Sequence, residues 1–178
     1  PISELVKKFN LKKVKAIVPG GETGQLSIFN GLEAAEKLAN HEASVVLIHD
    51  GVRPLINSKV IRDNIACVKN NGSAITTAPA KETIVLVNAS QQVSEVVDRT
   101  RSFTAKAPQS FKLSEILEVE RDAISKGITD AIDSSTLMGM YHKTLHIVEG
   151  PYENIKITTP EDLEIAGLFI RGRLVDCC

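Results

Sequence analysis

The sequence predicts an α/β fold whose sheet is mostly parallel and carries helices on both faces. Strand and helix patterns alternate along the chain, as they do in successive βαβ units. The continuous β-branched run S-V-V-L-I-H over residues 44–49 indicates a strand that is covered on both faces. The 178 residues contain no internal repeat and no low-complexity linker, so we expect one domain over residues 1–178.

The first half of the chain alternates regularly. Its helices are predicted from apolar residues that recur on one face, as Ile61, Ile65 and Val68 do. In order, we expect a strand over residues 14–18, a helix over 27–38 and a strand over 44–49. A helix that Asn57 or Ser58 caps and Asn70-Asn71-Gly72 closes comes next, and then a strand over 73–78.

The second half begins with a hairpin that interrupts this alternation. Two strands over residues 83–87 and 93–97 are joined by a polar turn, and we expect the pair to project as a dimerisation arm over about 83–97. Next we expect a helix over 114–126 capped by Ser114 and a short helix from Asp133 or Ser134 to Met140. A strand over 144–149 and an extended segment over 155–157 follow. The last helix begins at Thr159-Pro160 and has Leu163, Ala166 and Ile170 on its buried side.

Composition excludes several classes of protein. The net charge of −1 gives no broad positive field, so nucleic acid is not an expected partner. No apolar run approaches the roughly 18 residues of a membrane span, and the first residues carry no signal-peptide pattern. Cys67, Cys177 and Cys178 make neither a disulfide framework nor a metal pattern. We therefore expect a cytoplasmic protein with reduced thiols and no membrane partner.

Three groups of side chains stand apart from the core pattern. Asp50 and Arg53 follow a buried strand, where ligands of parallel sheets bind; a loop ion pair is the equal alternative. Lys156 stands among β-branched residues just before a helix start and suits a phosphate, although a lysine extending from an edge strand fits as well. The two arginines of Asp98-Arg99-Thr100-Arg101 could clamp a phosphate, but a solvated basic loop is the simpler interpretation.

Taken in order, four motifs resemble one family of enzymes. They are G-G-E-T-G-Q-L-S-I-F-N-G-L, H-D-G-V-R-P, D-R with A-P-Q-S-F, and V-E-G-P-Y-E-N-I-K-I-T-T-P-E-D-L. The chain resembles the 2-C-methylerythritol 4-phosphate and ribitol-5-phosphate cytidylyltransferases from about residue 14 to 170. The resemblance implies a Rossmann-like sheet of the nucleotide-diphospho-sugar transferase type, a Mg²⁺-dependent transfer of CMP from CTP to a polyol phosphate, and a homodimer whose arms swap.

The resemblance also assigns roles to individual residues. It places the cytosine ring at Gly20, Gly21, Glu22 and Ser27, and the ribose and the Mg²⁺ at Asp50 and Gly51. Arg53 belongs to the same motif, as a substrate contact or as a structural residue. The polyol phosphate is placed at Thr83 and Arg99, and both substrates at Lys156. The polyol phosphate would attack the α-phosphorus of CTP in line and pyrophosphate would leave. Such a transfer requires positioning and charge neutralisation, which Lys156 and Arg99 would supply as catalytic residues.

Departures from the family's pattern leave alternatives open. No Gly-rich loop precedes Val14, so we expect either an N-terminally truncated chain or a protein that has lost catalysis. Gly24 stands where the family has arginine, and Ala107 where it has threonine. The acceptor is slightly more consistent with methylerythritol phosphate, and hence isoprenoid synthesis, than with ribitol phosphate for a cell-surface polymer. A non-catalytic dimerising remnant and a general nucleotide-binding module are the other hypotheses.

Overall fold

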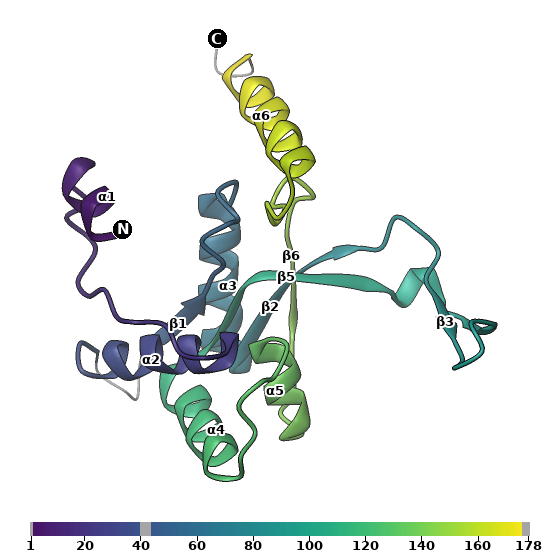
Figure 1. Ribbon diagram of the computed structural model, residues 1–178, viewed down its shortest axis with the longest axis horizontal. Coiled ribbons are helices and arrows are strands. Elements are labelled where there is room, and N and C mark those ends of the chain that lie inside the picture. Colours follow the sequence, from purple (N-terminus) through teal and green to yellow (C-terminus); the bar gives the residue numbers. More distant parts are fainter. Residues whose placement is uncertain (1, 40–43, 176–178) are drawn as a thin grey trace. The chain divides into compact units, whose positions relative to one another are not determined.

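The computed structural model describes residues 2–39 and 44–175, which divide into two compact units. The first unit comprises residues 1–44 and 112–143, and the second comprises residues 45–111 and 144–178. Figure 1 traces the chain through both of them. The single domain expected over residues 1–178 stays a prediction.

The first unit is helical. It contains α1 (Ile2–Lys8), α2 (Gly24–Glu36), α4 (Leu113–Ser125) and α5 (Ser134–Met140), with α4 packed against both α2 and α5. Ile116, Val119 and Ala123 of α4 are buried, as their helical spacing predicts. The expected Ser114 cap is wrong, because Lys112 precedes the helix and its side chain makes no capping hydrogen bond.

The strand expected over residues 14–18 does not form. This segment has no regular secondary structure, and Val14, Ile17 and Val18 are exposed. A strand needs a neighbour to accept its backbone hydrogen bonds, and the helices described in this unit offer none. Apolar, β-branched composition alone is therefore not sufficient for a strand here.

The second unit is built on a four-stranded sheet in the order β1-β5-β2-β6. Its strands are β1 (Val45–Ile48), β2 (Ser73–Pro79), β5 (Phe103–Lys112) and β6 (Ile147–Glu149). β2 pairs in parallel with β6 and antiparallel with β5. The α/β fold class is confirmed, and the sheet is mixed because β5, which the sequence analysis left out, runs against β2.

Helix α3 (Ser58–Asn71) packs against β1, β2 and β6. The Asn57 side chain accepts a hydrogen bond from Val60 N at 2.9 Å, and Gly72 ends the helix with φ of 89°. Both ends therefore lie where the capping residues predict them. Val68, Ala74 and Val148 form the buried centre between this helix and the sheet.

The expected arm is present as β3 (Val85–Val87) and β4 (Val93–Val96), which pair antiparallel. Figure 1 shows this hairpin extending away from β2 and β5. The 3₁₀ helix η1 (Arg99–Arg101) then leads the chain into β5. Every residue of β3 and β4 is exposed, so the hairpin presents apolar side chains to solvent on both strands.

Helix α6 (Pro160–Val175) begins at the expected start signal. The Asp162 carboxylate accepts hydrogen bonds from the N–H groups of Thr158 and Thr159, both at 2.9 Å. Its predicted buried face is only partly right: Ala166 is buried, but Leu163 and Ile170 are exposed. Among the described helices, none is long and apolar enough to span a membrane.

Candidate active site

Two loops that are more than 100 residues apart in sequence meet in the second unit. One follows β1 and carries Asp50 and Arg53; the other follows β6 and carries Lys156. Ile157 N donates to Val52 O at 2.9 Å, which fixes the two loops side by side. The Lys156 Nζ atom lies 3.6 Å from Asp50 Oδ1. Two of the predicted site residues are thus neighbours in the fold.

Arg53 connects the two loops. Its Nε donates to Asp50 Oδ2 at 2.9 Å, and its Nη1 donates to the Asn154 carbonyl oxygen at 2.9 Å. The side chain is only 11% exposed. The loop ion pair considered as an alternative for Asp50 and Arg53 is therefore present. An arginine committed to these bonds orients the carboxylate, and a direct contact between Arg53 and substrate stays a prediction.

Lys156 differs from Arg53 in its exposure. Half of its side chain is exposed, and its nearest anionic atom is the Asp50 oxygen at 3.6 Å. This is a loose pair compared with the 2.9 Å bond of Arg53 to the same carboxylate. A mobile ammonium on a flexible stem is suited to contact phosphate oxygens.

Asp50 is the carboxylate that the resemblance associates with Mg²⁺. Among the described residues, no three His, Cys, Asp or Glu side chains gather as a metal cluster. Mg²⁺ is commonly held by one or two carboxylates together with substrate phosphates and water. Asp50 fits this mode, since Arg53 occupies its Oδ2 and only the looser Lys156 faces Oδ1. The next residue, Gly51, has open space where a Cβ would lie.

The predicted base-binding residues form a loop in the first unit, residues 20–27, which we call the glycine loop. Ser27 Oγ accepts a hydrogen bond from Gly21 N and donates to Thr23 O, both at 2.9 Å. A Cβ on Gly21 would lie 2.4 Å from Leu26 Cβ. Packing against α2 therefore requires glycine at position 21. Glu22 is exposed.

A buried polar network holds the glycine loop from behind. Gln25 Nε2 donates to Glu120 Oε2 and to Ile128 O, both at 3.0 Å, and Gln25 Oε1 accepts from Ala131 N at 2.9 Å. Thr23 Oγ1 caps α2 by accepting from Leu26 N and also donates to Thr129 O. The first turn of α2 is thereby fixed to the segment 128–131.

Glu120 is the charged member of this network and is 1% exposed. Its Oε1 atom finds no hydrogen-bond partner within the described part of the chain. Burial raises the pKa of Glu120, and the hydrogen bond from Gln25 opposes that rise. The carboxyl group is thus held nearer to its protonated form than an exposed glutamate would be.

Thr83 and Arg99 belong to the arm. Thr83 precedes β3, Arg99 begins η1, and both are exposed. The Asp98 carboxylate accepts from Thr100 N at 2.9 Å and from Thr100 Oγ1 at 2.7 Å. In the described part of the second unit, no hydrogen bond or ion pair joins Thr83 or Arg99 to Asp50 or Lys156. The structure does not bring these predicted site residues together within one chain.

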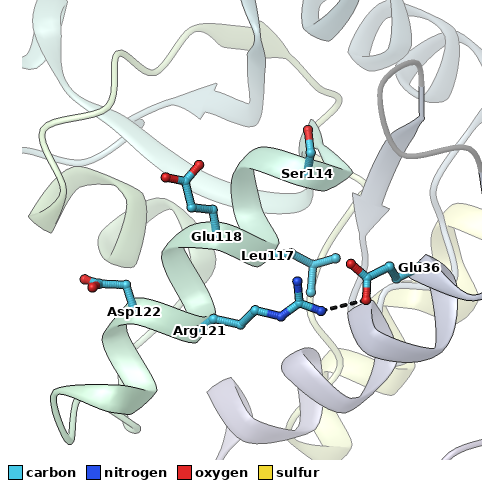
Figure 2. Close-up of a pocket in the computed structure, with 6 residues that line it drawn as sticks. All are labelled: Glu36, Ser114, Leu117, Glu118, Arg121 and Asp122. Atoms are coloured by element: carbon cyan, nitrogen blue, oxygen red, sulfur yellow. Dashed lines mark hydrogen bonds and ion pairs between the residues drawn. The ribbon is translucent and has the colours of Figure 1, made fainter.

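A groove between α2 and α4 in the first unit has none of the predicted site residues in its lining. It is lined by Glu36, Ser114, Leu117, Glu118, Arg121 and Asp122, and Figure 2 shows Arg121 reaching across it to Glu36. Arg121 Nη2 lies 2.5 Å from Glu33 Oε1 and 2.6 Å from Glu36 Oε2. These ion pairs raise the pKa of Arg121 and join α4 to α2, so we assign Arg121 a structural role.

Two residues of this site, Asn154 and Lys106, were not predicted to be functional. Asn154 is fully buried, and it joins the loop after β6 to β5 through a 2.7 Å bond from its Nδ2 to Ala107 O. Lys106 is half-buried and reaches the Asn154 carbonyl oxygen at 3.4 Å. The sequence could have pointed to them only by position, since Asn154 lies within the last motif and Lys106 directly precedes A-P-Q-S-F.

The chain matches the family model described as IspD, 2-C-methyl-D-erythritol 4-phosphate cytidylyltransferase, over residues 2–172. Ribitol-5-phosphate cytidylyltransferase of Streptococcus agalactiae serotype III (strain NEM316) is 74% identical over 90% of this chain and 67% of that protein. The protein of that name from Vibrio parahaemolyticus is 54% identical over 92% of the chain and 68% of its own length. The chain thus spans about two thirds of each of these relatives.

More distant relatives are named for the other acceptor. The 2-C-methyl-D-erythritol 4-phosphate cytidylyltransferase of Alkaliphilus oremlandii is 37% identical over 95% of the chain and 70% of that protein. The crystal structure of 4-diphosphocytidyl-2C-methyl-D-erythritol synthase from Anaerococcus prevotii is similar with a TM-score of 0.82 and 27% identity, covering 96% of this chain and 78% of that one.

Proposed function

Since this chain belongs to the cytidylyltransferase family whose model it matches over residues 2–172, we propose that it transfers CMP from CTP to ribitol 5-phosphate. The motifs alone favour methylerythritol phosphate slightly, but the relatives favour the alternative acceptor. Two proteins at 74% and 54% identity carry the ribitol name, whereas the methylerythritol name appears at 37%. Isoprenoid synthesis is therefore not part of this proposal. We include a cytoplasmic location in the proposal, because the reaction consumes CTP.

The observation that carries the proposed chemistry is the meeting of Lys156 with Asp50. An oxygen of the acceptor phosphate attacks the α-phosphorus of CTP, and the bond from that phosphorus to the bridging oxygen of pyrophosphate breaks. Negative charge accumulates on the transferring group and on the leaving group. Lys156, held 3.6 Å from Asp50 Oδ1 and half exposed, can turn from the carboxylate to these phosphate oxygens.

Asp50 is the proposed Mg²⁺ residue. Its Oδ1 atom and phosphate oxygens of CTP would hold the ion, which neutralises phosphate charge when it is bound. Arg53 fixes the orientation of the carboxylate by binding Oδ2. The second proposed nucleotide element is the glycine loop, where Gly20, Gly21, Glu22 and Ser27 would receive the cytosine ring.

A homodimer completes the proposal. Val85, Leu86, Val87, Val93 and Val96 of the arm are between 45% and 64% exposed. A two-stranded hairpin with this much exposed apolar surface is marginal alone, so a second copy of the chain would stabilise it. Thr83 and Arg99, which contact neither Asp50 nor Lys156 within one chain, would then serve the partner's polyol phosphate.

The experiment is a pyrophosphate-release assay on the protein as its gene encodes it. CTP and Mg²⁺ are supplied with either ribitol 5-phosphate or 2-C-methylerythritol 4-phosphate at matched concentrations. We expect kcat/KM for ribitol 5-phosphate to exceed that for the other acceptor at least about tenfold. A preference for methylerythritol phosphate would contradict the acceptor, and no turnover with either would favour the non-catalytic remnant.

A further inference from the structure

Strand β5 contains a bulge that presents one lysine. Ala105 pairs with Thr77 and Gln109 pairs with Ile75, so Lys106, Ala107 and Pro108 lie opposite the single residue Thr76. Proline cannot donate to a strand ladder and is tolerated at a bulge for that reason. Lys106 is therefore the first residue of a segment that leaves the regular register of the sheet.

Buried side chains fix the backbone of this bulge. Asn154 Nδ2 donates to Ala107 O at 2.7 Å, and Thr76 Oγ1 donates to Pro108 O at 2.7 Å. Both donor residues are 0% exposed. Thr76 is itself held by Asn64 Nδ2 at 3.0 Å. The two residues after Lys106 are thus anchored by hydrogen bonds inside the core, which gives the lysine a rigid base.

Lys106 and Arg53 share one hydrogen-bond acceptor, the carbonyl oxygen of Asn154. Lys106 Nζ lies 3.4 Å from Asn154 O, the same oxygen that accepts Arg53 Nη1 at 2.9 Å. In the described residues no carboxylate lies within ion-pair distance of Lys106, and Asp50 is already bound to Arg53 and near Lys156. Lys106 is therefore a half-buried cation beside another cation, without an anion of its own.

The electrostatic surroundings of Lys106 agree with this geometry. Burial lowers the pKa of Lys106, the nearby charges of Arg53 and Lys81 lower it further, and Glu153 opposes them. Lys81 lies over the ring of Tyr152 at 3.8 Å from its centre. A bound dianion would relieve the repulsion among these cations and supply the missing counter-charge.

We propose that Lys106 binds the phosphate of the acceptor and is a further substrate-binding residue of the reaction. The proposal rests on the function proposed above and adds a residue to it. A phosphate placed beside Lys106 would lie at the end of a series of contacts that runs through Asn154 O and Arg53 to Asp50. Phosphate recognition by a lysine is a point-charge contact, so the site would accept the phosphate of different polyols.

The test replaces the charge and keeps the apolar stem, with Lys106→Met in the protein as its gene encodes it. Lys112→Met is the matched control, since Lys112 lies in the same strand and is exposed. We expect Lys106→Met to raise the KM for ribitol 5-phosphate roughly 10- to 100-fold, with the KM for CTP changed less than about threefold. Lys112→Met should leave both constants unchanged, and both variants should melt within about 2 °C of the wild type.

An unchanged KM for the acceptor in Lys106→Met, or an increase confined to CTP, would overturn the assignment. Inorganic phosphate provides a readout that does not need turnover. Its binding, followed by NMR shifts of the bulge amides, should saturate in the wild type and weaken at least about tenfold in Lys106→Met. Equal phosphate binding by the two proteins would also overturn it. Failure of wild-type turnover with every acceptor would refute the proposed function alone, because the phosphate titration still decides the role of Lys106.

Discussion

Gly21→Ala tests whether the glycine loop holds the nucleotide. The added Cβ would lie 2.4 Å from Leu26 Cβ, 2.8 Å from the Leu26 carbonyl carbon and 3.0 Å from Ser27 N. Ordinary contacts between carbon atoms are about 3.5–4.0 Å, so the loop or the helix must move by about 1 Å. The helix is fixed by the Thr23 cap and by Gln25, and the loop is therefore the part that moves.

That movement would break the 2.9 Å bond from Gly21 N to Ser27 Oγ. Overpacking of this kind costs about 1–3 kcal/mol of folding stability. A displacement of about 1 Å at a substrate contact reduces the rate roughly 100-fold. We therefore expect kcat/KM for CTP, measured at saturating acceptor, to fall by about that factor while the protein remains folded in a thermal melt.

Gly31→Ala is the control for this substitution. Gly31 lies inside α2 with nothing within 4 Å of an added Cβ, and alanine there should stabilise the helix by about 0.5–1 kcal/mol without affecting turnover. Wild-type kcat/KM for CTP in Gly21→Ala would refute the reasoning. It would mean that the nucleotide does not contact this loop, whatever the effect on stability.

Three further predictions concern the buried network, the core and the charged residues. Because burial raises the pKa of Glu120, the stability it contributes is full below the ordinary value of 4.5 and is lost as pH rises through the raised pKa. The melting temperature of Glu120→Gln minus that of the wild type should thus become more positive between about pH 4.5 and 7. A difference that stays constant with pH would contradict a raised pKa of Glu120 as a source of pH-dependent stability. Asn64→Ala should cost about 2–3 kcal/mol in urea unfolding, because the buried Ser110 hydroxyl and Thr76 lose their partner; a cost below about 0.5 kcal/mol would contradict that network. Lys156→Ala should slow turnover on the order of a hundredfold, and Arg99→Ala should chiefly raise the KM for the polyol phosphate. Each substitution should change the free energy of unfolding by less than about 0.5 kcal/mol. Wild-type kinetics in one of these variants would show that the replaced residue does not belong to the site.

Elements with local signals at both ends were predictable from sequence. Helix α3 begins after Asn57 and ends at Gly72 because a side-chain oxygen and a left-handed glycine act within a few residues of the helix. Helix α2 begins three residues earlier than expected, at Gly24. Its cap is Thr23, and the glycine that follows, Gly24, is a poor helix former, so the first turn did not look helical in the sequence.

Elements that depend on distant partners were not predictable. The segment 14–18 has strand-like composition, but no strand of the described residues pairs with it, and it remains irregular. Strand β5 contains Pro108, and proline disfavours a strand interior; the strand forms because the proline lies in the bulge. In each case the decisive information is which other segment comes alongside.

The same distinction applies to the site. Asp50, Arg53 and Lys156 were visible because they occur in recognisable motifs, and the fold brings them together. Gln25 and Glu120 are separated by 95 residues and look like ordinary polar positions on two helices. Only the packing of α2 on α4 turns them into a buried pair.

Arg53 and Lys106 both donate to the backbone carbonyl oxygen of Asn154, and this limits how the region can vary among homologues. No substitution at position 154 can delete a carbonyl group, so exchange of that side chain would release the bulge through Ala107 while leaving the acceptor chemically intact. What can be altered is the path of the main chain. Gly150 controls that path, because its N–H binds Thr77 O at 2.8 Å and an added Cβ would lie 2.5 Å from Thr76 Cγ2. Inherited variation at Gly150 should therefore be rarer than at Lys106 itself, even though Gly150 carries no charge.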